Sequence, residues 1–234
     1  MQNIDFPFDK FNFNSDSIFE GLPEDDITLL NKSMVTHSYK KGEILFRGGS
    51  YPTGIYYIKK GKVKKYNTDK EGREQIFYVY REGELFGYHA LLSEEKFTDT
   101  ACTIEESIIS FIPKDDFLEA IQVSSILSNR LLKVMSHEFG VLVNALSVLA
   151  QKTVRERLAV SLLVLRDKYK KENQNSIPVE LDLSRDDLSK FVGTARETLV
   201  RLIHDFKEEG LIETKGRKII LLKPLDISKI ANLY

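Results

Sequence analysis

Ser184–Ile203 reads SRDDLSKFVGTARETLVRLI, and this stretch predicts two short helices joined by a glycine turn. Ser184 is placed to N-cap the first helix, and Gly193 supplies the backbone freedom that a tight turn needs. Thr194 and Glu197 have the Thr-x-x-Glu spacing of a capping box, so the second helix is expected to begin at Thr194. Apolar residues at i, i+3, i+4 and i+7 predict a buried stripe on this second helix: Leu199, Leu202, Ile203 and Phe206. The pattern is typical of a helix-turn-helix, whose second helix enters the major groove of DNA.

The opposite face of the second helix carries Arg196, Glu197, Val200, Arg201 and His204. Arginine can bond to O6 and N7 of guanine through two hydrogen bonds, and a carboxylate can accept one from N4 of cytosine. Glu197 precedes Arg201 by four residues, so an ion pair could orient that guanidinium before binding. A carboxylate facing phosphates would be repelled, and its place here therefore favours base reading. The alternative is an ordinary solvated face with an i,i+4 ion pair.

The segment GTARETLVRL resembles the recognition element of the Crp/Fnr family of bacterial transcription regulators. The catabolite-activator branch carries an Arg-Glu-Thr triplet followed by a further arginine, which Arg196, Glu197, Thr198 and Arg201 match. This resemblance extends over nearly the whole chain after about residue 20. It implies a homodimer that binds a palindromic operator in double-stranded DNA and works with RNA polymerase. It also implies half-sites similar to TGTGA, with both arginines on guanines and Glu197 on cytosine. The expected DNA-binding residues are Arg196, Glu197, Arg201, Thr194, Thr198, Arg185 and Arg217.

Glycine usage separates the chain into an N-terminal and a C-terminal part. Nine of the thirteen glycines fall between Gly21 and Gly87, where turn residues interrupt runs of Tyr, Ile, Phe and Val. Breaks about every 8–12 residues predict an antiparallel sandwich or barrel, similar to the cyclic-nucleotide-binding jelly roll of the Crp/Fnr family. The expected fold class is α+β. Its parts are an N-terminal tail (1–20), a β jelly-roll sensor domain (21–122), a long dimerisation helix (123–152) and a winged helix-turn-helix domain (153–234).

The expected dimerisation helix has two adjacent apolar stripes. The first follows heptad steps and is interrupted by Glu138; it consists of Leu127, Leu131, Val134, Val141, Ala145 and Val148. The second consists of Met135, Phe139, Leu142, Leu146 and Leu149. One stripe is enough to cover a barrel, whereas two suggest a partner helix and hence a homodimer. The alternative is a single buried helix in a monomer.

The net charge of −1 does not itself indicate a nucleic-acid partner, so DNA binding requires a local basic surface. Part of this surface is expected at the turn Lys215–Arg217, between two short strands that form the wing. Contacts of such residues with phosphates would make binding strongly salt-dependent. The other basic residues expected to contribute are Lys152, Arg155, Arg157, Arg166, Lys168, Lys170, Lys171, Arg185 and Lys190.

Composition argues against an enzyme, a metal site and a membrane protein. The single cysteine, Cys102, excludes an intrachain disulfide, a four-thiolate iron–sulfur cluster and a cysteine zinc site. The four histidines lack metal-ligand spacing, and Gly48–Gly49 matches no phosphate-binding loop. No apolar run approaches the ~20 residues that span a bilayer, and the N-terminal segment lacks the basic and apolar regions of a secretory signal. We therefore expect a cytoplasmic protein with no catalytic or metal-binding residues.

The position of the cyclic-nucleotide cassette departs from the pattern of the family. Members that bind cyclic nucleotides carry Gly-Glu-Leu, in which the glutamate bonds the ribose, and an arginine that neutralises the phosphate. Here Gly87 is kept, but Tyr88 replaces the glutamate. The arginine position falls near Thr98, and the adjacent Asp99 would repel a phosphate. These losses predict that cyclic AMP is not the effector.

The effector, if one exists, is therefore an unidentified small molecule. Leu142 and Val143 stand where the cyclic-AMP-responsive branch has a Thr-Ser pair facing the purine. His89 falls where the carbon-monoxide-sensing branch places a haem ligand, so a haem-dependent gas sensor is kept as an alternative to a structural histidine. A ligand-binding or interaction module that no longer reads DNA is the other alternative. The candidate effector residues are Gly87, Tyr88, His89, Thr98, Asp99 and Leu142.

Overall fold

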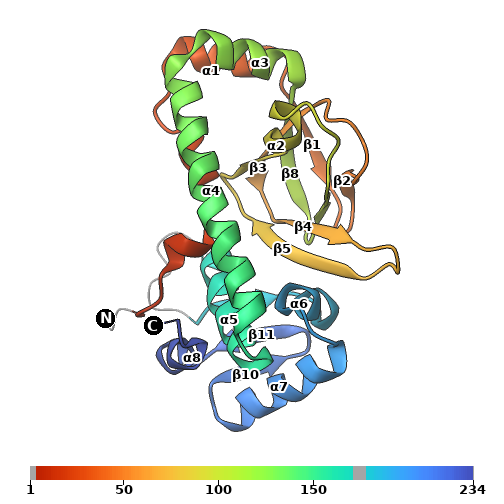
Figure 1. Ribbon diagram of the computed structural model, residues 1–234, viewed down its shortest axis with the longest axis vertical. Coiled ribbons are helices and arrows are strands. Elements are labelled where there is room, and N and C mark those ends of the chain that lie inside the picture. Colours follow the sequence, from red (N-terminus) through yellow and green to blue (C-terminus); the bar gives the residue numbers. More distant parts are fainter. Residues whose placement is uncertain (1–3, 171–177, 234) are drawn as a thin grey trace. The chain divides into compact units, whose positions relative to one another are not determined.

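The computed structural model describes residues 4–170 and 178–233 (Figure 1). The chain divides into two compact units, each of which is described by itself. The first comprises residues 13–73 and 77–140, and the second comprises the other described residues. The expected order of a β-roll, a long helix and a winged helix-turn-helix is confirmed.

The first unit is a roll of short strands in two four-stranded sheets, with orders β1-β8-β3-β6 and β2-β7-β4-β5 (Figure 1). Neighbouring strands such as β3 and β8 run antiparallel, with Ile55 opposite Ile112. Both of these side chains are buried, which places the apolar face of the sheet in the core. The strands are β1 (Val35–Tyr39), β2 (Ile44–Phe46), β3 (Gly54–Lys60), β4 (Val63–Thr68), β5 (Glu74–Tyr80), β6 (Leu85–Phe86), β7 (Thr100–Thr103) and β8 (Ser107–Pro113).

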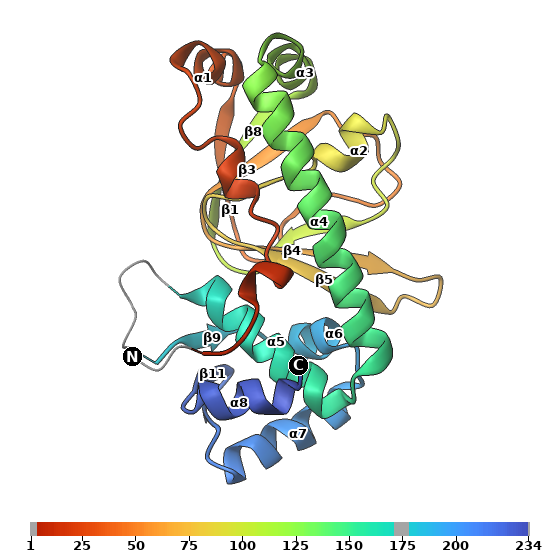
Figure 2. The same ribbon diagram turned by 60° about the vertical axis from the view of Figure 1, so that its left-hand side comes forward.

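Helices cover one side of the roll and tie down the chain that precedes it. The helices α1 (Glu24–Asn31) and α3 (Lys114–Val123) lie side by side near the start of α4 (Ser125–Gln151) in both views (Figures 1 and 2). The short helix η2 (Ser15–Ile18) joins the same core through Ile18, which is fully buried. Part of the expected N-terminal tail is therefore packed rather than free. The remaining helix of this unit is α2 (Tyr88–Leu92).

The long helix α4 has one buried and one exposed apolar stripe. Glu138 does not interrupt the first stripe, because its side chain is only 1% exposed and occupies a core position between Val134 and Val141. In the second stripe Phe139 and Leu146 are 71% and 65% exposed. By length and composition alone, α4 is a helix apolar and long enough to cross a membrane.

The second unit is built on α5 (Val154–Tyr169), whose N-terminus carries a complete capping box between Thr153 and Glu156. The helices α6 (Arg185–Val192) and α7 (Arg196–Glu208) form the expected helix-turn-helix, and α8 (Pro224–Ala231) packs against α5 (Figure 2). A three-stranded sheet has the order β10-β11-β9. Its strands are β9 (Glu180–Asp182), β10 (Ile212–Lys215) and β11 (Lys218–Leu221). The sequence did not predict β9 or α8. The short helix η1 (Phe8–Phe11) also belongs to this unit.

Candidate nucleic-acid interface

The turn between α6 and α7 is fixed by the backbone conformation of Gly193 and by hydrogen bonds to backbone carbonyls of the turn. The Ser184 hydroxyl oxygen accepts a hydrogen bond from the Asp187 amide at 2.9 Å, which confirms the predicted N-cap of α6. Gly193 ends α6 in the left-handed region with φ +71°, a conformation that favours glycine. A second anchor comes from Arg157 on α5, which donates to the carbonyls of Val192 and Gly193 at 3.0 and 2.9 Å. Sequence reasoning assigned Arg157 to a basic surface and missed this positioning role.

The predicted capping box at the start of α7 is wrong. The N-cap of α7 is Ala195, and no side chain caps this helix end. The amides of Gly193 and Thr194 both donate to the Ser189 carbonyl, at 2.9 and 3.1 Å. Thr194 therefore belongs to the C-terminal end of α6, and the first extended residue before α7 comes one position later. The left-handed glycine, rather than the side-chain spacing, decides where α7 begins.

The outer face of α7 matches the prediction. Arg196, Glu197 and Arg201 are exposed, and no described residue forms an ion pair or hydrogen bond with the side chain of any of the three. The expected pair between Glu197 and Arg201 is therefore absent from the structure. Val200 and His204 are exposed beside them, and Thr198 is half-buried. Two guanidinium groups and one carboxylate are thus available on one helix face. The other face is anchored in the core by Leu199, Ile203 and Phe206, which are buried, with Leu202 partly buried.

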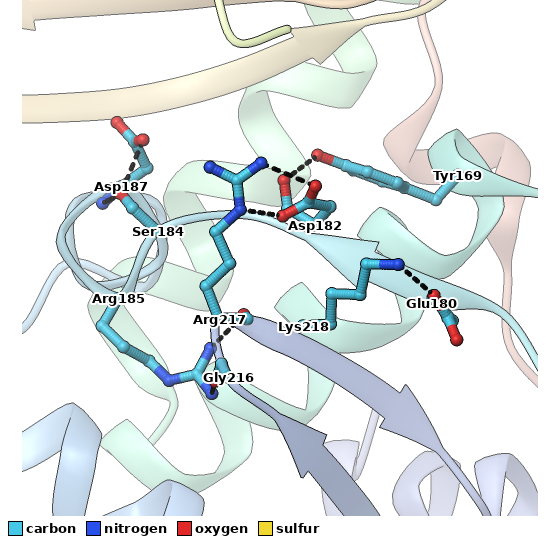
Figure 3. A network of polar contacts seen from close by, with 9 residues as sticks. All are labelled: Tyr169, Glu180, Asp182, Ser184, Arg185, Asp187, Gly216, Arg217 and Lys218. Atoms are coloured by element: carbon cyan, nitrogen blue, oxygen red, sulfur yellow. Dashed lines mark hydrogen bonds and ion pairs between the residues drawn. The ribbon is translucent and has the colours of Figure 1, made fainter.

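The basic groups of the wing are paired with acidic groups of β9 (Figure 3). Arg217 donates to the Asp182 carboxylate at 2.7 Å, and Lys218 donates to that of Glu180 at 2.7 Å. These hydrogen bonds raise the pKa of both cations and lower the pKa of Glu180. The wing tip is therefore less positive than the sequence suggests. Lys215, 3.9 Å from Glu213, is the most loosely paired wing cation.

Arg185 holds the wing turn from α6. Its guanidinium donates to the carbonyl of Arg217 at 2.8 Å and lies 3.5 Å from that of Gly216 (Figure 3). Partial burial lowers the pKa of Arg185. The side chain points to the turn of its own unit and has a positioning role in this structure.

Several other basic residues expected at a DNA surface are also engaged inside the second unit. Arg155 forms an ion pair with Glu209 at 2.6 Å, and Lys190 forms one with Asp186 at 2.6 Å. Lys168 is buried, with 3% exposure. Lys171 lies outside the described residues. The outer face of α7 is consequently less neutralised by its neighbours than the expected phosphate-binding surface.

Two of the candidate effector residues, Tyr88 and His89, form a polar cluster with Glu138. Gly87, with φ +93°, precedes α2 and places Tyr88 in the core with 0% exposure. The Tyr88 hydroxyl donates a short hydrogen bond to the Glu138 carboxylate, and Nε2 of His89 lies 2.6 Å from Oε2 of Glu138. Burial and the charge of Glu138 hold the pKa of Tyr88 well above its usual value, so this hydroxyl remains a donor. Sequence reasoning missed Glu138, although a carboxylate within an apolar heptad stripe was the available signal.

A second polar pair occupies the position expected for a phosphate. The Asp99 carboxylate and the Lys65 ammonium group are 3.1 Å apart, and both side chains are nearly buried. The backbone carbonyl of Thr98 accepts from the Asn67 side chain at 3.1 Å. A phosphate bound at this position would face Asp99 and compete with it for Lys65.

Three further observations bear on the effector candidates. Leu142 lies on the exposed stripe of α4, with 41% exposure. An open groove of about 590 Å³ runs along Tyr39 and Gly42–Arg47 of the roll, and it contains none of the candidates. The Nε2 atom of His89 is engaged with Glu138, whereas its Nδ1 atom, which can also ligate a metal, has no hydrogen-bond partner among the described residues.

Comparison with known proteins supports the same division of the chain. The family described as "Cyclic nucleotide-binding domain" matches residues 36–124, and the "Crp-like helix-turn-helix domain" matches residues 156–227. The transcriptional activator protein FnrA of Stutzerimonas stutzeri is 27% identical over 192 residues, which cover 82% of this chain and 78% of that protein. The CRP-like cAMP-activated global transcriptional regulator of Mycobacterium tuberculosis is 26% identical over 204 residues, which cover 87% of this chain and 91% of that protein.

Solved structures share the fold. FixK2 from Bradyrhizobium japonicum matches with a TM-score of 0.75 at 20% identity, over 84% of this chain and 96% of that chain. A CRP/FNR-family transcriptional regulator from Thermus thermophilus matches with a TM-score of 0.67 at 25% identity, over 85% and 98%. These similarities, the order of the two matched domains and the helix-turn-helix with an open outer face lead to one conclusion. The chain belongs to the Crp/Fnr family of DNA-binding transcription regulators.

Proposed function

We propose that this regulator reads a palindromic operator through α7, with Arg196 and Arg201 on guanines and Glu197 on a cytosine. The observation that carries the proposal is that all three side chains are exposed and unengaged on one face of a helix. A guanidinium group without an internal partner can use both of its donor edges on O6 and N7 of guanine. Such a protein acts where the DNA is, in the cytoplasm, and RNA polymerase is its expected partner.

The exposed apolar stripe of α4 supports a homodimer within this proposal. Phe139, Leu142 and Leu146 are 71%, 41% and 65% exposed, which is a large apolar area for a single helix face. In a two-fold dimer the same stripe on each copy covers the other. A two-fold protein of this kind would read two half-sites about 34 Å apart on one face of the DNA. Substitution of Phe139 by Glu is expected to yield a monomer in sedimentation-velocity experiments.

The test of base reading is a binding titration on two duplexes. Fluorescence anisotropy is measured with a TGTGA-type palindrome and with a scrambled duplex of the same composition, at fixed salt. Replacing Arg196 or Arg201 with Ala is expected to cost about 1–3 kcal/mol on the palindrome and much less on the scrambled duplex. Lys207→Ala, which removes an exposed cation near the C-terminal end of α7, is the matched control. Equal weakening on both duplexes by the arginine variants would refute base reading.

We propose further that the roll does not take a cyclic nucleotide. The Lys65–Asp99 pair and the commitment of Tyr88 to Glu138 support this, because they occupy the expected phosphate and ribose positions with internal contacts. Cyclic AMP is therefore expected to leave the affinity for DNA unchanged. A heat signal for cyclic AMP in titration calorimetry that Asp99→Asn strengthens would contradict the proposal. A Soret absorption band that is lost in His89→Ala would instead support the haem alternative.

A further inference from the structure

Val200 is the one large apolar side chain exposed on α7, with 49% exposure. The core-facing side of the helix is already filled by Leu199, Ile203 and Phe206. Val200 is therefore not one of the core residues of its unit. A β-branched residue at an exposed helix position is also less favourable than Ala, Lys or Glu. Neither packing nor helix propensity accounts for a valine at this position.

The place of Val200 on the helix is specific. It follows Arg196 by one turn and directly precedes Arg201, so it lies within the surface that carries the base-reading side chains. Glu197 and His204 stand three residues before and four residues after it, and both are exposed. Val200 is thus an isolated apolar spot surrounded by polar groups. A surface that only contacted phosphates would have no use for such a spot.

The major groove of unmodified DNA offers one apolar group at the base edges, the C5-methyl of thymine. We infer that Val200 packs against a thymine methyl group in each half-site, beside the base pairs that Arg196 and Arg201 contact. The inference rests on the proposed function and adds a specificity-determining residue to it. The preferred ligand is then a DNA duplex in which a T·A pair lies next to base pairs that contain guanine.

Removal of the methyl group alone tests this contact. Deoxyuridine keeps every hydrogen-bonding group of thymidine and lacks only the C5-methyl. The operator is first selected by the wild-type protein from a random duplex pool, and each of its thymidines is then replaced by deoxyuridine in both half-sites together. Anisotropy titrations are run on every duplex with wild-type protein and Val200→Ala. Val35→Ala on β1 is the matched control, because Val35 has a similar exposure of 46% in the other unit.

One symmetric replacement is expected to weaken wild-type binding. Loss of one buried methyl group costs roughly 0.8 kcal/mol, or about fourfold in affinity per half-site and roughly 16-fold for the operator. Val200→Ala should bind the parent operator about as weakly as wild type binds the deoxyuridine duplex, and should not respond to the replacement. Val35→Ala should behave as wild type.

The outcomes separate this inference from the proposed function. If wild type selects an operator and the Val200→Ala variant keeps the full deoxyuridine effect, base reading stands and the Val200 contact is refuted. The contact is equally refuted if no deoxyuridine duplex binds more weakly than the parent operator. If wild type enriches no sequence from the pool, the proposed function fails, and the Val200 inference fails with it.

Discussion

The Tyr88–Glu138 hydrogen bond provides a sharp test of how the roll holds α4. Both side chains are buried, at 0% and 1% exposure, and they join α2 to α4 across fifty residues of sequence. Tyr88→Phe removes the hydroxyl and keeps the ring, so the packing of α2 should be preserved. The Glu138 carboxylate then retains His89 as its remaining partner. Hydrogen bonds to charged groups contribute about 1.5–3 kcal/mol, and we expect a loss of that size in the unfolding free energy of the first unit.

Urea unfolding followed by tyrosine fluorescence measures this loss, since the chain has ten tyrosines and no tryptophan. The urea concentration at the midpoint of unfolding should fall, while the slope of the unfolding free energy against urea concentration stays constant. Tyr51→Phe is the matched control, because Tyr51 is 67% exposed and its hydroxyl removal should change stability by less than about 0.5 kcal/mol.

A double-mutant cycle with Glu138→Gln isolates the pairwise contribution. Gln keeps the volume and an acceptor oxygen but removes the charge. Residues in direct contact couple by about 0.5–3 kcal/mol, so the double variant should be less destabilised than the sum of the two single variants. Additive effects, or a Tyr88→Phe variant as stable as the control, would refute the view that this hydrogen bond holds α2 to α4.

Three further predictions concern the second unit. Gly193→Ala forces an alanine into the left-handed region and should destabilise this unit by about 1–2 kcal/mol in urea unfolding. Hydrogen bonds from Thr153 and Asn232 lower the pKa of Glu156 from 4.5 to about 2. The ionised Glu156 carboxylate therefore stabilises the folded state fully above pH 4.5, and this contribution is lost as the pH falls through about 2. Thr153→Ala should raise the midpoint of the Glu156 titration measured by NMR. Arg185→Ala should release the wing turn, seen as faster amide exchange at Gly216 and Arg217.

Each of these predictions has a control or an outcome that contradicts it. Gly140→Ala lies within α4 with open space around its Cβ position, so it should be neutral or stabilising where Gly193→Ala is not. An unchanged Glu156 midpoint in Thr153→Ala would show that the capping box does not set its pKa. Unchanged exchange in Arg185→Ala would show that the wing turn is held without Arg185, by the β10–β11 pairing and the Arg217–Asp182 pair.

Local sequence patterns were enough to predict the helix-turn-helix and its outer face. The i, i+3, i+4, i+7 repeat of α7 depends only on helical geometry, so Leu199 and Phe206 were correctly placed inside and Arg196 and Arg201 outside. The start of α7 was predicted wrongly because two local signals competed. The left-handed Gly193 drew Thr194 into the end of α6, and side-chain spacing could not show which signal would prevail.

The sequence by itself determined the order of the elements, the identity of the family and the composition of the face of α7, because periodicity, turn residues and short motifs act over a few residues. Only the tertiary structure decided which charges are free. Arg217 meets Asp182, Lys65 meets Asp99, and Glu138 meets Tyr88 and His89 from elements far apart in the chain. The distance and burial that set the strength of these pairs exist only once the strands and helices have packed together.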